Sequence, residues 1–454
     1  MTNFYKLGTS SSTIYIDKNK VTKTVVLNSS DDIYSIQKGI ELINNFNPNS
    51  VCNPTNIEFK TRKIEAEEFI ECKYQQNIQR PWISHEWISS IQLFQLAQLI
   101  LQQEEILLKN NLTFVDARAS NYYLGSNLKL VDLCSFKNLN KHTYYSFETD
   151  FANNFLTPLL LEKKLCISIG NYFKGYLDSI GINTLNLNNF LLNPKYFLFN
   201  FKRFLNQFIS NKISQSSSEF VDFLLDEDTN LPDIKTKKAL QKIKTLKKLL
   251  DSSKPLISSQ TEWSEYSSFH NEEYMKKKAD KIQDFLDLVP SNSSVIDLGS
   301  NIGSSKFRNI STFIDKDINV CNFLRLNVDP KQIVLCGDIS QEMLNIIKNR
   351  DSKILNLNGY IDYAIVMSLL HHIIIDAGLN AQAFYDALSK LYKKVLLEFI
   401  TDKDPMIKFL IKKKGEVINW SWSQHSKIAK DYFNISDSYY LSETRFVVLL
   451  TKKD

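Results

Sequence analysis

The chain has 454 residues, of which 43% are hydrophobic, and this is enough apolar material for more than one buried core. Its 55 basic and 50 acidic residues leave a formal net charge of +5, so the composition gives no indication of a nucleic-acid partner. The first residues carry no basic segment followed by an apolar one, and no stretch approaches the ~20 apolar residues of a transmembrane helix. We therefore expect a cytoplasmic protein of two or three domains.

The six cysteines are widely spaced along the sequence and form no CxxC pair. This spacing argues against a zinc knuckle and against a disulfide framework alike. We expect reduced, mostly buried thiols at all six positions, which are Cys52, Cys72, Cys134, Cys166, Cys321 and Cys336.

The N-terminal region, residues 1–213, has an α+β pattern. Short runs of β-branched residues predict strands at 13–19, 20–27 and 58–69. The run from Ser89 to Asn110 has the periodicity of a long helix. A single domain of mixed strands and helices is the expected result.

A polar stretch, residues 214–261, separates this region from the rest and marks the main domain boundary. Within it, Leu240, Ile243, Leu246 and Leu250 fall at helical spacing among seven lysines. The pattern predicts a basic amphipathic helix. Such a helix either docks on its own protein through the apolar face or contacts an anionic membrane or a polyanionic substrate.

The C-terminal region, residues 262–454, alternates β-branched runs with amphipathic segments. This alternation predicts a parallel sheet covered by helices, that is, an α/β Rossmann-like domain. The expected strands are 293–299, 311–315, 332–338, 360–372 and 393–400.

The first of these strands leads into a glycine-bearing turn that suits a nucleotide-like ligand. Asp297 ends the strand, and Gly299 and Gly303 allow the backbone to approach a ligand closely. Asn301 stands in the middle of the turn and tolerates a left-handed backbone better than most residues do. Dehydrogenases also use glycine-rich turns, but this one lacks their GxGxxG spacing.

Polar residues recur at the ends of the following strands. Asp315, after the second strand, can accept two hydrogen bonds from a ribose diol, and Asp338, after the third, can meet an adenine amine. Ser368, at the end of the fourth strand, completes the predicted cofactor site. For both aspartates the alternative is an ordinary strand-end or helix-capping role. The order of these polar residues along the successive strands favours an S-adenosylmethionine site.

Two histidines, His371 and His372, follow the fourth strand at the edge where a ligand crevice is expected. An imidazole there could take the proton from an attacking hydroxyl, since its usual pKa is near neutrality. Hydrogen bonding to substrate or cofactor and simple packing are the alternatives. Glu398, Asp402 and Asp404 follow the fifth strand and either line an acceptor pocket or form a charged loop.

Several segments together resemble a family of two-part bacterial class I methyltransferases that includes a host-specificity nodulation protein. The resemblance runs intermittently from about residue 80 to 410 and implies S-adenosylmethionine as the cofactor, without settling the acceptor. The matching segments are residues 80–87 (RPWISHEW), 116–121 (DARASN), 130–136 (LVDLCSF), Trp263 with Tyr266, 297–303 (DLGSNIG), 369–372 (LLHH) and 398–406 (EFITDKDPM).

The N-terminal half is also similar to a protein-kinase-like fold. Asp116 and Asn121 have the spacing of a kinase catalytic loop, with Asp116 as the catalytic residue, and Asp132 follows where kinases keep a metal-binding aspartate. The resemblance implies Asn121 and Asp132 as ligands of Mg-ATP. It further implies Gly8 in the phosphate-covering turn, Lys23 as the phosphate-binding lysine and Glu41 as its partner.

This half departs from the kinase pattern in two places. Phe114 and Val115 replace the usual His-Arg, and Asp132-Leu-Cys replaces Asp-Phe-Gly. Active phosphotransfer, nucleotide binding without transfer and a structural role therefore all stay open for the kinase-like domain.

The leading hypothesis is a methyltransferase that methylates an oxygen of a glycan, a glycolipid or a small metabolite. The glycan suggestion comes from bifunctional kinase-methyltransferases that cap bacterial surface polysaccharides and pair the same kinds of domain. A protein that acts mainly as a kinase, a pseudoenzyme adaptor and an RNA methyltransferase are the alternatives. Nucleic acid is the least favoured partner, because no RNA-binding module is recognisable.

Overall fold

The computed structural model describes residues 12–173 with short gaps, 232–255, and 271–453 with gaps within 349–358 and at 416–417. They belong to two compact units. Unit 1 comprises residues 1–80, 84–86 and 90–256, and unit 2 comprises 81–83, 87–89 and 257–454. The turn predicted at Gly8, Cys166, Trp263 and Tyr266 lie outside the described residues.

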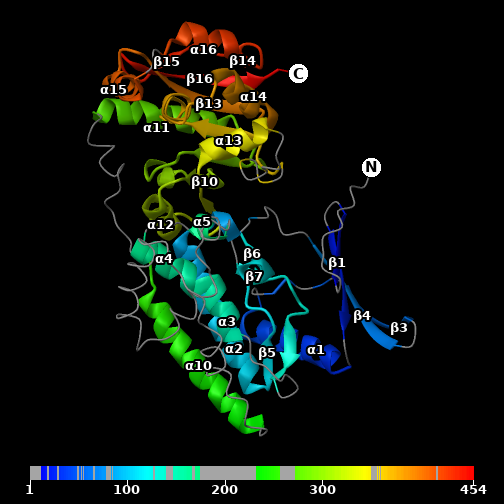
Figure 1. Ribbon diagram of the computed structural model, residues 1–454. Helices are drawn as coiled ribbons and strands as arrows, with labels where there is room; N and C mark the ends of the chain where they lie inside the picture. Colours follow the sequence, from blue (N-terminus) through cyan, green and yellow to red (C-terminus); the bar gives the residue numbers. More distant parts are fainter. Residues whose placement is uncertain are drawn as a thin grey trace. The chain divides into compact units, whose positions relative to one another are not determined.

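Unit 1 opens with a four-stranded antiparallel sheet in the order β1-β2-β4-β3 (Figure 1). The run 58–69, expected as one strand, is divided between β3 and β4, and Ile64 pairs with Glu67 where the hairpin closes. The Glu-rich sequence there has low strand propensity, which the prediction overlooked. The strands of unit 1 are β1 (Ser12–Asp17), β2 (Lys20–Leu27), β3 (Asn56–Ile64), β4 (Glu67–Asn77), β5 (Leu112–Phe114), β6 (Tyr122–Leu124), β7 (Leu128–Leu130) and β8 (Phe136–Asn138).

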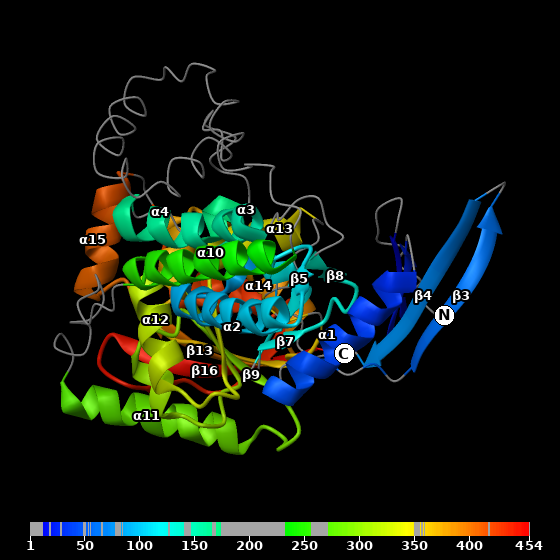
Figure 2. The same cartoon turned by 90° about the horizontal axis from the view of Figure 1, so that it is seen from below.

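Helices make up most of the remainder of unit 1. The long helix expected from Ser89 to Asn110 is confirmed as α2, and it packs beside α10 (Figure 2). The helices are α1 (Ser30–Phe46), α2 (Ser90–Lys109), α3 (Phe147–Phe151), α4 (Thr157–Leu165), α5 (Ile169–Phe173) and α10 (Pro232–Ser252), with short turns η1 (His85–Trp87), η2 (Ala119–Asn121) and η4 (Ala152–Leu156).

The basic amphipathic helix forms as predicted and docks on its own unit. Ile243, Leu246 and Leu250 of α10 are buried. Lys242 pairs with Glu148 at 2.7 Å, and Lys247 pairs with Glu105 of α2. The apolar face and two lysines are therefore used inside unit 1.

Unit 2 is built on a mostly parallel sheet in the order β11-β10-β9-β12-β13-β16-β14. β9 to β13 run parallel, and β16 is antiparallel to β13 and β14. The strands are β9 (Val295–Leu298), β10 (Thr312–Asp315), β11 (Ile333–Cys336), β12 (Tyr363–Val366), β13 (Lys394–Ile400), β14 (Phe433–Ile435), β15 (Tyr439–Tyr440) and β16 (Arg445–Lys452).

Helices cover both faces of this sheet, so its central strands are mostly apolar, with buried acids such as Asp297 in β9 and Glu398 in β13 as exceptions. Val295 of β9 packs in a core with Phe285 of α11 and Leu324 of α12. Figure 2 shows α14 on the other side of β13 and β16 from α11. The helices are α11 (Glu272–Asp287), α12 (Ile318–Asn327), α13 (Ile339–Ile347), α14 (Ala381–Leu391), α15 (Pro405–Lys414) and α16 (Trp422–Ala429), with turns η6 (Gly303–Lys306) and η7 (His372–Asp376).

The predicted parallel sheet is confirmed, and its strands are shorter than expected, most of all in the run 360–372. In the run 360–372 only Tyr363–Val366 is extended; Ser368 then has a left-handed backbone with φ 52°, and η7 begins at His372. The expected strand was too long because apolar residues, such as Met367, Leu369 and Leu370, continue after the chain has left the sheet. In the described parts of the chain, no helix is long and apolar enough to cross a membrane.

Candidate functional site

A cavity of about 430 Å³ in unit 2 lies where β9, β10, β11 and β12 end. β9 lies between β10 and β12, so the chain leaves β9 toward one edge of the sheet and later returns to its other side. Loops that diverge at such a reversal leave a crevice outside the carboxyl ends of the strands. The strand order therefore puts this cavity where ligands of open α/β sheets bind.

The turn after β9 forms one part of the cavity wall. Gly299 has φ 69° and Asn301 has φ 45°, both in the left-handed region, which Asn tolerates better than most residues do. A Cβ atom at Gly299 would lie 3.0 Å from Leu369, whereas one at Gly303 would meet no atom within 4 Å. The turn thus leaves open space beside Gly303.

Asp315 ends β10 and lies on the cavity wall. Its Oδ2 accepts a hydrogen bond from the amide of Asn301 at 2.9 Å, and its Oδ1 accepts one from the amide of Asp317 at 2.9 Å. Burial raises the pKa of this carboxyl, against the lowering effect of these amides. Each oxygen keeps a lone pair that a ligand hydroxyl could use.

Asp297 and Asp338 also line the cavity. Asp297 is buried, with 2% of its surface exposed. Asp338 is exposed and caps α13, where its Oδ1 accepts from the amides of Ser340 and Gln341 at 2.8 and 3.3 Å. The capping role weighed for Asp338 is therefore present, and it employs only one carboxylate oxygen.

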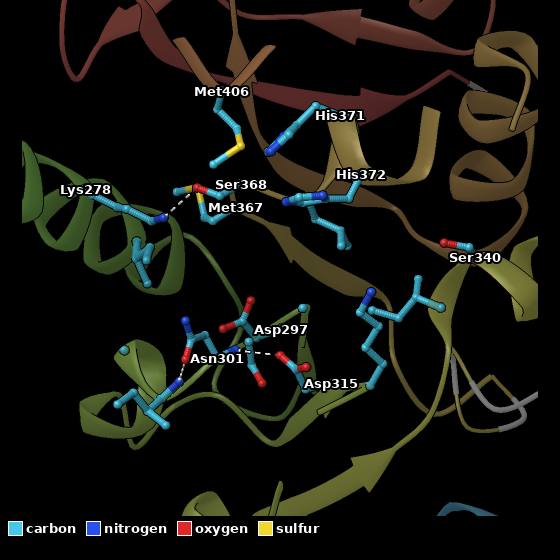
Figure 3. A pocket seen from close by; sticks show the side chains of 18 of the residues that line it. Lys278, Asp297, Asn301, Asp315, Ser340, Met367, Ser368, His371, His372 and Met406 are labelled. Carbon is cyan, nitrogen blue, oxygen red and sulfur yellow. Dashed lines mark hydrogen bonds between the residues drawn. The ribbon is translucent and has the colours of Figure 1, made fainter. Parts of the chain in front are cut away.

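The opposite wall carries the two histidines and two thioethers, from Met367 and Met406 (Figure 3). His371 is buried, and burial, together with the neighbouring His372, Arg445 and Lys278, keeps its pKa well below the usual value. His372 is part-exposed, and its Nδ1 lies 2.7 Å from Oδ2 of Asp376. The two imidazoles therefore differ, because His372 lies beside a carboxylate and His371 is buried.

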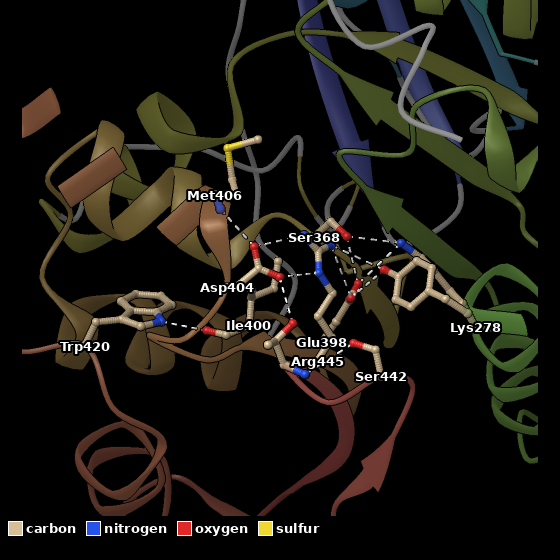
Figure 4. A network of polar contacts seen from close by, with 11 residues as sticks. Lys278, Ser368, Glu398, Ile400, Asp404, Met406, Trp420, Ser442 and Arg445 are labelled. Atoms are coloured by element: carbon tan, nitrogen blue, oxygen red, sulfur yellow. Dashed lines mark hydrogen bonds and ion pairs between the residues drawn. The ribbon is translucent and has the colours of Figure 1, made fainter. Parts of the chain in front are cut away.

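A buried polar network lies behind this wall and is centred on Glu398 (Figure 4). Tyr274 donates to its Oε1 at 2.7 Å, and Ser368 donates to its Oε2 at 2.8 Å. Nζ of Lys278 lies 3.3 Å from the same Oε2 and donates to Ser368 Oγ at 3.1 Å. Burial alone would raise the pKa of Glu398, but Lys278 and Arg445 lower it below the usual value. Glu398 is therefore ionised.

Arg445 extends the network to the start of α15. Its Nε lies 2.9 Å from Oδ2 of Asp404, while Oδ1 of Asp404 accepts from the amide of Met406 at 2.9 Å and so caps the helix. Glu398 and Asp404 are thus held inside the protein, and Asp402 is exposed. Glu398 lies within β13 rather than after it, and neither Glu398 nor Asp402 nor Asp404 is among the residues that line the cavity.

All nine positions that the sequence assigned to a methyl-transfer site line this one cavity; they are Asp297, Gly299, Asn301, Gly303, Asp315, Asp338, Ser368, His371 and His372. The sequence reasoning missed Met275 and Lys278 of α11, Met406 of α15 and Arg445 of β16. The amphipathic run that begins after the Asn271 cap could have suggested α11, but nothing near Arg445 in the sequence links it to the cavity.

The kinase-like residues gather in unit 1. Nζ of Lys23, on β2, lies 2.7 Å from Oδ1 of Asp132. The expected partner Glu41 instead pairs with Lys38, one turn earlier on the exposed face of α1, at 3.0 Å. Side-chain geometry therefore contradicts the Lys23–Glu41 pair and replaces it with Lys23–Asp132.

Asp116 and Asn121 lie between β5 and β6. Nδ2 of Asn121 donates to the carbonyl oxygen of Asp116 at 2.9 Å, and Nε of Arg118 lies 2.7 Å from Oδ1 of Asp116. Burial raises the pKa of Asp116. Among the residues that the structure describes, no group of three or more His, Cys, Asp or Glu side chains could hold a metal ion.

No protein-family model and no curated protein matches the sequence. Among solved structures, monomeric WbdD is similar with 18% identity over 43% of this chain and 45% of that chain, at a TM-score of 0.30. Another WbdD structure, described as a bifunctional kinase-methyltransferase, has 18% identity, covers 43% of each chain and has a TM-score of 0.29. The chain thus spans less than half the length of the WbdD chains.

Two further similar structures are mostly covered by the match. PH0226 protein from Pyrococcus horikoshii OT3 has 13% identity over 40% of this chain and 93% of that chain, at a TM-score of 0.27. A protein from Thermobifida fusca YX, provisionally assigned as a methyltransferase, has 16% identity over 42% and 87%, at a TM-score of 0.28. Similarities with TM-scores this low assign no function to this chain.

Proposed function

We propose that unit 2 is a class I S-adenosylmethionine-dependent methyltransferase domain that methylates an oxygen. The observation that carries the proposal is Asp315, a strand-end carboxylate held by two backbone amides on the wall of an open cavity at the reversal of the strand order. A carboxylate fixed in this way is suited to a ribose diol, because both oxygens can accept a hydroxyl hydrogen bond without moving.

The remaining wall residues fit the same cofactor. The cavity volume of about 430 Å³ is within the range of small-molecule sites. Ser300 also lines the cavity, and its Oγ is buried without a hydrogen-bond partner among the described residues. Asp338 would meet the adenine amine with the oxygen not used for capping, and the turn at Gly303 leaves room for close backbone approach.

The bound cofactor would supply an electrophilic methyl group on its sulfonium, which an oxygen displaces in line. The chain's contribution is to orient the acceptor and to receive its proton. We assign the proton to Nε2 of His372, because Nδ1 of this ring is directed to Asp376. His371 is a poorer base, since burial and the nearby Lys278 and Arg445 disfavour its charged form.

The acceptor class remains that predicted from the sequence, a hydroxyl of a glycan, a glycolipid or a small metabolite. A base beside the cavity favours such an acceptor, because a neutral hydroxyl loses a proton during transfer, whereas a phosphate or carboxylate oxygen is already ionised. The small net charge continues to argue against nucleic acid as the substrate.

Calorimetric titration with S-adenosylhomocysteine tests the proposal. We expect wild-type protein to bind it, and Asp315→Ala to weaken binding by about 2 kcal/mol, roughly thirtyfold, because hydrogen bonds to a charged group are lost. Asp317→Ala is the matched control, since Asp317 caps α12 and is not among the lining residues. Absence of binding to wild type, or equal binding by Asp315→Ala, would overturn the assignment and favour a pseudoenzyme adaptor.

A second activity, nucleotide binding or phosphotransfer by unit 1, is favoured by the Lys23–Asp132 pair. A lysine on a strand beside an aspartate that follows a hairpin could exchange its partner for phosphate while the aspartate binds Mg²⁺. Here Asp116 would accept the proton of the substrate hydroxyl, and Asn121 would be the second metal ligand. Stabilisation by Mg-ATP in a thermal shift assay, lost in Asp132→Ala, is the expected result; no shift in wild type would exclude it.

A further inference from the structure

The outer face of α15 combines an exposed aromatic ring with three lysines. Phe409 is 59% exposed, the joint highest value among large hydrophobic side chains of the described residues. Lys408, Lys412 and Lys413 are exposed as well, and helical spacing puts them around Phe409 on one side of the helix. We call these four residues the α15 surface. Covering this phenyl ring with a partner would remove apolar area from water and so favour docking.

The α15 surface adjoins the candidate methyl-transfer cavity. Met406, in the first turn of the same helix, lines that cavity, and Phe409 follows it at the i,i+3 spacing of neighbouring side chains. At the other end, Nζ of Lys414 donates to the carbonyl oxygen of Asp376, the residue that pairs with His372. The helix is therefore fixed both to the cavity wall and to the candidate base.

The chemistry of this surface matches an anionic bilayer. A phenyl ring can enter the boundary between head groups and acyl chains, while lysines beside it contact lipid phosphates. The other basic helix, α10, exposes Lys237, Lys244 and Lys248 along one face, and none of its side chains whose burial is described is a large exposed hydrophobic one. Comparing α10 with α15 therefore distinguishes attraction to a bilayer by charge alone from attraction by charge together with an apolar side chain.

We propose that the α15 surface docks unit 2 on an anionic phospholipid bilayer, so that the cavity faces an acceptor carried by a lipid. Docking itself follows from Phe409 and the lysines, whereas the choice of a lipid-linked acceptor rests on the proposed methyltransferase function. A peripheral contact of this kind needs no membrane-spanning segment, because one aromatic ring and several lysines act at the surface of the bilayer.

Co-sedimentation of the full chain with phospholipid vesicles tests the docking. We expect binding to vesicles with equal amounts of phosphatidylcholine and phosphatidylglycerol, and none to phosphatidylcholine alone. The triple variant Lys408→Gln, Lys412→Gln, Lys413→Gln should lose about a hundredfold in affinity, because each lysine near an anionic surface contributes roughly fivefold. Phe409→Ser should weaken binding by about tenfold with all charges retained.

The matched control is the triple variant Lys237→Gln, Lys244→Gln, Lys248→Gln on α10, which removes the same charge and should bind vesicles like wild type. An equal loss in this control, or no loss in Phe409→Ser, would reduce the contact to non-specific charge attraction and overturn the proposal. Failure of wild type to sediment with the anionic vesicles would also overturn the proposal. Binding of a mixed-sequence RNA, rather than vesicles, by the α15 surface would identify nucleic acid as the partner of this surface.

S-adenosylhomocysteine titration of the same variants separates this inference from the proposed function. The lysines and Phe409 are not among the residues lining the cavity, so cofactor affinity should be unchanged in every variant. Vesicle binding without cofactor binding would leave the docking surface valid and remove the methyltransferase assignment. Cofactor binding without vesicle binding would leave the methyltransferase assignment valid and remove the docking surface.

Discussion

Two buried glutamates, one in each unit, are accommodated in opposite ways. In unit 2, Glu398 is fully enclosed yet ionised, because Lys278 and Arg445 compensate for the loss of water around it. In unit 1, Glu162 receives a hydrogen bond from the Ser90 hydroxyl, and burial raises its pKa to about 8. Burial likewise raises the pKa of Asp150 to about 6, with Asp116 contributing.

This difference teaches what each site is prepared to bind. The paired charges behind the unit 2 cavity keep Glu398 ionised, so the polar network behind the cavity wall has a fixed pattern of charge. Burial raises the pKa values of Asp116 and Asp150, and the charge of Asp116 adds to the rise at Asp150. A cation or a phosphate-bound metal ion would offset this repulsion. The same contrast predicts opposite responses of the two units to pH.

The largest expected effect concerns Glu162. Its folded pKa of about 8 lies above the ordinary value of 4.5, so the folded state binds the proton more tightly. The stabilisation is therefore complete below pH 4.5 and is lost as pH rises through 8, by roughly 4–5 kcal/mol. Hydrogen exchange of the α4 amides across this range measures it.

Glu162→Gln provides the control, because a neutral amide of the same shape has no proton to lose. Its α4 protection should vary much less with pH between 4.5 and 8 than that of wild type. If wild type and variant show the same pH profile, Glu162 is ionised in the folded protein and the contrast between the units fails.

Removing the central acid of unit 2 should produce the next largest effect. Glu398→Ala leaves Lys278 and Arg445 beside each other without their shared counter-charge, and loss of one member of a buried ion pair costs about 3–5 kcal/mol. Chemical denaturation with hydrogen exchange in β13 measures the loss. Glu273→Ala, which breaks the exposed pair with Lys277, should leave stability unchanged; equal losses in both variants would refute the network's role.

A histidine gives unit 2 the opposite pH response. His425 packs among Phe399 and Trp420, and burial lowers its pKa from 6.5 to about 4. The unfolded chain then binds the proton more tightly, so stability is present above pH 6.5 and declines as pH falls toward 4, by about 3 kcal/mol. His425→Phe should show a shallower decline, and exchange in α16 would detect it; a decline as steep as that of wild type would contradict the assignment.

The sequence specified the cavity of unit 2 well, because local patterns encode it. Asp297 and Asp315 each follow a short run that contains β-branched residues, and the ends of parallel strands necessarily meet at one edge of a sheet. The residue type of Asn301 is compatible with the left-handed backbone found there. These positions required only the order of the strands, which their spacing suggested.

What the sequence could not supply depends on distant parts of the chain. Arg445 reaches Asp404 only because β16 inserts antiparallel beside β13, and none of β14, β15 and β16 was predicted. Lys23 pairs with Asp132 rather than with Glu41 because α1 turns Glu41 outward toward Lys38. Pairings of this kind follow from tertiary packing and have no local signature.

The smallest expected effect tests how far the turn of unit 2 is prepared in advance for its ligand. Asn301 has φ 45°, where a left-handed backbone costs alanine about 1 kcal/mol and costs glycine nothing. We therefore expect Asn301→Ala to be less stable than Asn301→Gly by this amount, measured by denaturant unfolding of unit 2. Equal stabilities of the two variants would show that the turn in Asn301→Ala adopts another backbone conformation, and that the left-handed one is not imposed by the surrounding structure.

Gly303→Ala separates the turn's own geometry from its contact with a ligand. A Cβ atom at Gly303 meets no protein atom within 4 Å, so the variant should unfold like wild type. If the bound cofactor lies directly beside the backbone of Gly303, the added methyl group should nevertheless weaken S-adenosylhomocysteine binding. Unchanged binding would mean that the ligand keeps its distance from Gly303, and the close approach assumed for the turn would be wrong.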